Sequence, residues 1–150
     1  MLDLYGSVLF MGEMPILDKV FDVHGLANIL RGIKREAKAA DATIYGFLEA
    51  ASARPGQGVS TMFKFGRVYG LAEGGLAVLR IPYELVNPAK WTKTMLAGVE
   101  GDGKARNTVA AKRLFPSLDL RANPKCKVPS AGIVDAILIA EYGRRQQTRS

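Results

Sequence analysis

The sequence of 150 residues predicts a mixed α/β fold in a single domain, 1–150. Strand-forming runs alternate along the chain with stretches in which apolar residues recur every three or four positions, a pattern typical of a sheet covered by helices. Hydrophobic residues make up 48% and charged residues 23%, close to the globular average. The one cysteine and one histidine exclude a disulfide framework and a multi-cysteine zinc site.

The first elements expected are two short strands, a helix and a buried strand. Strand formers predominate in 4–11, and the turn at Glu13 leads towards a second strand, 16–20. Residues 24–39 place apolar side chains at helical spacing and basic side chains elsewhere on the helix, which predicts an amphipathic helix. The apolar run 42–50 predicts a buried strand that ends in Glu49.

The later elements are expected to be mostly helical. A loop with proline and glycines precedes a helix over 60–79, and a short strand follows at 83–86. Asn87 and Pro88 are typical of a helix start and predict a helix over 89–95. Two further helices are predicted, and Gly143 is expected to end the second of them: 104–114 and 133–142.

The net charge of +7 indicates a polyanionic partner, nucleic acid before acidic membrane. Nine Lys and Arg stand against three acids between Lys90 and Lys127. A purely solubilising surface charge is the alternative. No apolar stretch reaches the roughly 18–20 residues of a membrane helix, and the first fifteen residues lack the basic start of a signal peptide. We therefore expect a cytoplasmic protein without a membrane partner.

Three carboxylates stand in or beside apolar segments: Asp3, Glu49 and Asp135. An ionised acid in such surroundings is costly unless it is paired or binds a metal. Oxygen ligands from separate elements suit Mg²⁺ or Mn²⁺. For each acid alone, a helix cap, a strand end or a salt bridge is the alternative interpretation.

Four segments in this order resemble one family: FLEAASARPGQGVSTMFKFGRVYGLAEGGLAV (47–78), LVNPAKWTKTMLAG (85–98), KARNTVAAKRLFP (104–116) and VDAILIAEYGRR (134–145). Over nearly its whole length the chain resembles the small phage and bacterial RuvC-type Holliday-junction resolvases. The resemblance implies a ribonuclease-H-like fold, in which α-helices flank a mixed β-sheet. It also implies a homodimeric, Mg²⁺- or Mn²⁺-dependent endonuclease that nicks four-way DNA junctions symmetrically, in a bacterial or phage-infected cell.

The resemblance also implies roles for individual residues. Asp3, Glu49 and Asp135 would hold the metals, and Lys104 would stabilise charge at the scissile phosphate. The loop 53–62 would reach the junction centre, where Met62 or Phe63 would wedge against a base. The other expected DNA contacts are basic: Lys90, Lys93, Arg106, Arg113, Arg144 and Arg145. The expected dimer interface lies on the helix 60–79: Phe63, Gly66, Gly70 and Gly74.

Two departures from the family pattern keep other functions open. Only Met1 and Leu2 precede Asp3, and Ala131 stands near the place where the family usually has a further acid. A catalytically weakened protein that binds branched DNA without cutting it is therefore one alternative. A less selective nuclease acting on forks and flaps is another, and an adaptor for acidic proteins is a third.

Overall fold

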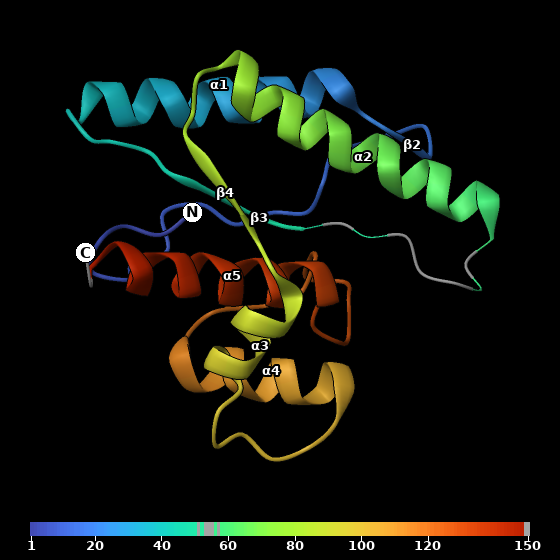
Figure 1. Cartoon of the computed structure of the whole chain (residues 1–150), viewed down its shortest axis with the longest axis vertical. Coiled ribbons are helices and arrows are strands. Elements are labelled where there is room, and N and C mark those ends of the chain that lie inside the picture. The colour runs from blue at the N-terminus through green and yellow to red at the C-terminus, as the bar shows by residue number, and fades with distance from the viewer. Residues whose placement is uncertain (51, 53–55, 57, 149–150) are drawn as a thin grey trace. The chain divides into compact units, whose positions relative to one another are not determined.

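The computed structural model describes residues 1–50, 52, 56 and 58–148, and these form a mixed α/β fold with five helices and two small sheets (Figure 1). The chain divides into two compact units. We call Met14–Leu85 the central unit, and Met1–Glu13 together with Val86–Ser150 the terminal unit. In the described residues the strands form one antiparallel and one parallel pair rather than a single larger sheet.

The central unit begins with a hairpin of β1 (Ile16–Leu17) and β2 (Val20–Phe21), in which Ile16 pairs with Phe21. The prediction of one strand over 16–20 is wrong, because Asp18 and Lys19 take positive φ values of 48° and 63° and turn the chain between the two strands. Two successive residues of this conformation form the tight turn that matches the twist of paired strands.

Helix α1 (Val23–Ala39) follows and confirms the helix expected over 24–39. It begins at Asp22, whose Oδ1 accepts a hydrogen bond of 2.9 Å from the Gly25 N–H and so satisfies an otherwise unpaired donor. Leu26 is buried on the apolar side of the helix, which packs against α2 (Val59–Val78).

The parallel pair consists of β3 (Gly46–Glu49) and β4 (Tyr83–Val86), which α2 connects. The strand expected over 83–86 is confirmed, and the one expected over 42–50 is shorter. The Gly46 N–H donates to the Pro82 carbonyl at 2.8 Å. A Cβ at position 46 would lie 3.0 Å from Tyr83 Cβ, so the close approach of the strands leaves little room for a larger residue there.

The core of the terminal unit lies between α3 (Pro88–Met95), α4 (Gly103–Leu114) and α5 (Ala131–Gln147), which Figure 1 shows together. The Asn87 side chain caps α3 by accepting from the Ala89 N–H at 2.8 Å. Trp91, Ala111 and Leu138 are among the most deeply buried side chains. All three helices stand where the sequence predicts them, although α5 extends past Gly143.

The N-terminal strand predicted over 4–11 is wrong for this structure. The segment forms only one isolated antiparallel bridge, between Leu2 and Val8. The Gly6 N–H donates to the Asp3 carbonyl at 3.1 Å, and Gly6 has a φ of +88°, which glycine adopts readily because it has no Cβ. The chain therefore turns at the point where the strand was expected to run straight.

Candidate functional site

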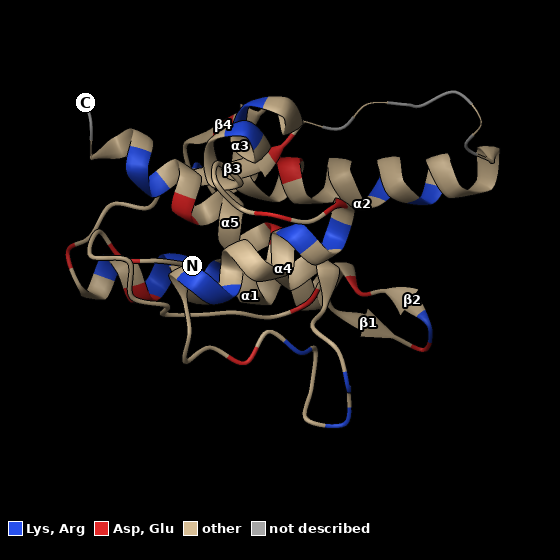
Figure 2. Cartoon of the chain, turned by 90° about the horizontal axis from the view of Figure 1, so that it is seen from below, with Lys and Arg blue, Asp and Glu red and all other residues tan. Residues whose placement is uncertain are grey.

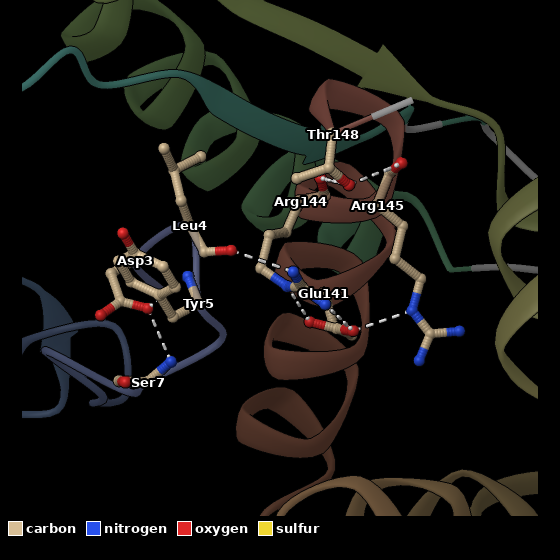
Figure 3. A network of polar contacts seen from close by, with 8 residues as sticks. All are labelled: Asp3, Leu4, Tyr5, Ser7, Glu141, Arg144, Arg145 and Thr148. Atoms are coloured by element: carbon tan, nitrogen blue, oxygen red, sulfur yellow. Dashed lines mark hydrogen bonds and ion pairs between the residues drawn. The ribbon is translucent and has the colours of Figure 1, made fainter. Parts of the chain in front are cut away.

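Asp3, the first of the three predicted metal ligands, is tied into that turn (Figure 3). Its Oδ1 accepts hydrogen bonds from the Ser7 N–H at 2.8 Å and the Tyr5 N–H at 2.9 Å. Chiefly through the backbone hydrogen bond from Ser7, the pKa of Asp3 lies below its ordinary value. The carboxylate is thus kept ionised by its own loop, and one of its oxygens already has two donors.

Asp135, the third predicted ligand, lies in the second turn of α5 and is half-buried. Its Oδ1 accepts a hydrogen bond of 2.8 Å from Asn107 Nδ2 of α4. The sequence analysis did not single out Asn107. The signal for it is weak, since an amide at that position becomes relevant only when α4 packs against α5.

Asp3 and Asp135 do not lie near the same part of α5. Arg144, near the end of this helix, donates from Nη1 to the Leu4 carbonyl at 3.0 Å, and Asp3 is one of the charges that raise its pKa. Nine residues separate Asp135 from Arg144, which is about 13 Å along a helix. Asp3 therefore lies beside the end of α5 opposite to the turn that carries Asp135.

Glu49, the second predicted ligand, is the last residue of β3 in the central unit and is half-buried. Asp3 and Asp135 both belong to the terminal unit. In the part of the chain that the structure describes, no three His, Cys, Asp or Glu side chains lie close enough together to hold a metal ion. Within the terminal unit the structure does not bring Asp3 and Asp135 together, and the three-acid metal site stays a prediction.

Glu141 is a buried acid that the sequence analysis did not consider (Figure 3). It is only 4% exposed and accepts from Arg144 Nε at 2.7 Å, from Arg144 Nη2 at 2.8 Å and from Arg145 Nε at 2.8 Å. Burial raises the pKa of Glu141, but the hydrogen bonds from the two arginines outweigh burial, and the pKa lies below its ordinary value. The spacing Glu141-x-x-Arg144-Arg145 was the available signal, because side chains three and four apart meet on a helix.

This network bears on two of the expected DNA contacts. Arg144 and Arg145 both bind the buried Glu141 carboxylate, and Arg144 also holds the N-terminal segment through Leu4. The remaining donors of Arg145 are the more accessible, since its side chain is 36% exposed against 24% for Arg144. Arg145 is therefore better placed than Arg144 to contact a phosphate.

The other predicted basic contacts fall into two groups. Lys90 and Lys93 on α3 and Lys104 in the first turn of α4 are exposed. Arg106 instead donates from Nε to the Val99 carbonyl at 2.8 Å and from Nη2 to the Leu96 carbonyl at 2.9 Å.

Arg113 Nη1 likewise donates to the Gly98 carbonyl at 3.1 Å. Arg106 and Arg113 therefore hold the loop between α3 and α4, a structural role that the sequence analysis missed. Figure 2 shows how the basic and acidic positions are distributed along the chain.

The residues expected to meet DNA or a second subunit on α2 are exposed. Met62 and Phe63 are 36% and 74% exposed, and no residue of α2 is buried. A Cβ added at Gly66, Gly70 or Gly74 would meet no atom within 4 Å. Within the loop 53–62, positions 53–55 and 57 lie outside the described residues.

No protein-family model and no curated protein matches this chain. Among the described residues, no helix combines the length and the apolar character needed to cross a membrane.

Proposed function

We propose that this chain acts on branched DNA as a structure-selective endonuclease with a ribonuclease-H-like ancestry, in the manner of the resolvases that it resembles. The observation that carries the proposal is the order of elements: β3 ends in Glu49 and is followed by α2, β4, α3, α4 and an α5 that bears Asp135. Each of the four resembling segments falls on the kind of element expected for it. The expected setting is the cytoplasm of a bacterial or phage-infected cell.

Exposed basic side chains support the DNA-binding part of the proposal. Lys90, Lys93 and Lys104 are exposed in the terminal unit, and each can hold a phosphate without reading base sequence. Because such binding releases counterions, we expect the affinity for DNA to fall steeply as salt is added.

A homodimer formed through α2 is part of the same proposal. Phe63 and Phe65 are 74% and 57% exposed on a helix with no buried residue. The open face at Gly66, Gly70 and Gly74 leaves room for another helix to approach closely. A second copy of the chain would cover this apolar helix and set the distance between two DNA sites, which is how symmetric nicking of a junction is achieved.

When bound, Mg²⁺ or Mn²⁺ supplies an activated water and stabilises the leaving oxygen of the phosphodiester. Since Asp3 and Asp135 lie near opposite ends of α5 within the terminal unit, we derive no cleavage step from the positions of the three acids. The same observation favours a second candidate function, a protein that binds junctions without cutting them.

The deciding experiment offers a labelled four-way junction and a linear duplex of the same sequence to the protein, with Mg²⁺ and then with Mn²⁺. The proposal expects paired nicks at symmetric positions in the junction and little cleavage of the linear duplex. Comparable cleavage of both substrates would indicate the less selective nuclease, and binding without nicks in either metal would indicate the second candidate.

Matched variants assign any cleavage to the predicted acids. Asp135→Asn keeps the acceptor for Asn107 and removes the charge, so nicking should fall strongly while binding stays. Asp102→Asn is the control, because Asp102 is exposed and its side chain makes no cap hydrogen bond at the start of α4. Equal cleavage by the two variants would remove Asp135 from the active site.

A further inference from the structure

A second basic surface lies on the central unit, whereas the basic residues that the sequence analysis selected all belong to the terminal unit. Four exposed bases recur on α1 at spacings of three, one and three residues, and we call them the α1 stripe: Arg31, Lys34, Arg35 and Lys38. Side chains at this spacing lie within about 100° of one another around a helix, so they share one face. In Figure 2 blue positions follow one another along α1.

A fifth base extends the stripe from another element. Arg80 follows α2 and lines, together with Lys34 and Lys38, an open depression of about 340 Å³. Arg80 has a φ of +52°, a conformation that costs a residue with a Cβ roughly 1–2 kcal/mol. Lys34 Nζ donates to the Leu79 carbonyl, which ties the end of α2 to the stripe. Asp41 also lines the depression and offsets part of its charge.

The dimensions of the stripe suit a nucleic-acid backbone. Seven residues separate Arg31 from Lys38, so the stripe runs for about 10 Å along the helix. One strand of duplex DNA carries a phosphate about every 3.4 Å of its axis, so this length spans about three phosphates. Glu36, the acid within this half of α1, is five residues after Arg31 and so points away from the centre of the stripe.

The apolar side of α1 argues against the other common polyanion, an acidic membrane. A helix that lies in a membrane surface exposes large apolar side chains beside its basic face. In α1 Leu26 is buried, Leu30 and Ile33 are half-buried, and none of the helix's large apolar side chains is among the exposed ones. The stripe therefore offers charge without a group that would insert into lipid.

We propose that the α1 stripe and Arg80 form a phosphate-binding surface of the central unit, which holds the backbone of duplex DNA. This inference rests on the DNA binding of the proposed function, but it does not require cleavage. The surface contacts backbone alone, so it contributes to the affinity for a linear duplex and for the arms of a four-way junction alike.

The test is a double substitution, Arg31→Gln with Arg35→Gln, in the full chain. Lys34 is left in place because it holds the Leu79 carbonyl. The matched control is Lys125→Gln with Lys127→Gln, which removes the same charge from exposed bases that are not among the expected DNA contacts. Fluorescence anisotropy measures binding to a labelled duplex and a labelled four-way junction over a range of salt concentrations.

The stripe variant should bind both DNAs about 10-fold more weakly, and its slope of log Kd against log salt should fall by about two, since each lost phosphate contact lowers the slope by about one. The control should change both quantities much less. If both variants lost the same affinity for DNA, the loss would follow from net charge alone and the proposal would be overturned. An unchanged Kd in the stripe variant would overturn it as well.

Two further outcomes separate this inference from the proposed function. If the wild-type protein binds junctions and the stripe variant binds them with the same affinity, only the proposal for the α1 stripe is overturned. Wild-type protein that binds neither DNA, or that binds vesicles containing phosphatidylserine in place of DNA, overturns both. Nicking measured on the same samples reports on cleavage independently of either result.

Discussion

Replacing the buried Glu141 by glutamine should destabilise the protein and loosen its N-terminal segment. The substitution preserves shape but replaces one carboxylate oxygen by an NH₂ group that faces a guanidinium. With the remaining oxygen kept on the two donors that share Oε1, the bond lost is the one from Arg144 Nε at 2.7 Å. The position therefore loses its charge and at least one charge-assisted hydrogen bond.

A hydrogen bond to a charged group contributes about 1.5–3 kcal/mol. Part of this loss is recovered, because the Arg144 and Arg145 side chains are 24% and 36% exposed and can turn towards water. Removing an acid from the C-terminal turns of a helix also returns about 0.3–1 kcal/mol from the helix dipole. We expect Glu141→Gln to lower the free energy of unfolding by about 1–2 kcal/mol at neutral pH.

Urea unfolding followed by circular dichroism measures this difference, with Glu100→Gln as the control at an exposed loop position. The pKa of Glu141 is lowered in the folded state from an ordinary value of 4.5. The folded state thus binds this proton less readily, so the stabilisation is complete above pH 4.5 and is lost as the pH falls through the folded-state pKa. The gap between wild type and Glu141→Gln should therefore narrow in acid. The reasoning would be refuted if Glu141→Gln lowered the free energy of unfolding no more than Glu100→Gln does. It would also be refuted if the difference between wild type and Glu141→Gln were the same in acid as at neutral pH.

The remaining predictions concern local backbone geometry. Gly46→Ala should cost about 1–3 kcal/mol, because its Cβ would meet Tyr83 Cβ at 3.0 Å, whereas Gly32→Ala in α1 meets no atom within 4 Å and should gain about 0.5–1 kcal/mol. Thermal unfolding of both variants checks this pair, and a stabilised Gly46→Ala would contradict it. Asp22→Ala removes the cap of α1 and should cost about 1 kcal/mol. Hydrogen exchange of the Gly25 amide should then speed up, and unchanged protection there would show that the cap contributes little.

The residues of the candidate site differ in how far the sequence could place them. Glu49 ends a strand and Asp135 lies on the last helix, as predicted, because each position follows from the pattern of its own neighbours. The structure does not bring Asp3 and Asp135 together within the terminal unit, and the metal group expected from the three acids stays a prediction. Grouping acids requires side chains from separate elements to meet, and the pattern along the chain does not determine that distance.

Several of the bases expected to contact DNA instead bind a group within the protein, and this too is decided by contacts between separate parts of the chain. Arg106 and Arg113 hold backbone carbonyls of the loop between α3 and α4, and Arg144 bridges Glu141 to Leu4. A count of charges predicts a basic protein, but it cannot separate an arginine that faces solvent from one that closes a loop. That distinction depends on which carbonyls the folded chain leaves without a partner.

The sequence by itself determined most of the helices and the strand 83–86, because capping residues and apolar spacing act over a few residues. It did not determine the fate of 4–11, which bends at Gly6, or the end of α5, where Glu141, Arg144 and Arg145 stabilise the helix beyond Gly143. Arg144 and Leu4 are 140 residues apart and meet through one hydrogen bond of 3.0 Å. Contacts of this kind exist only once the chain has folded, because the local sequence around each residue does not indicate which distant residue it will meet.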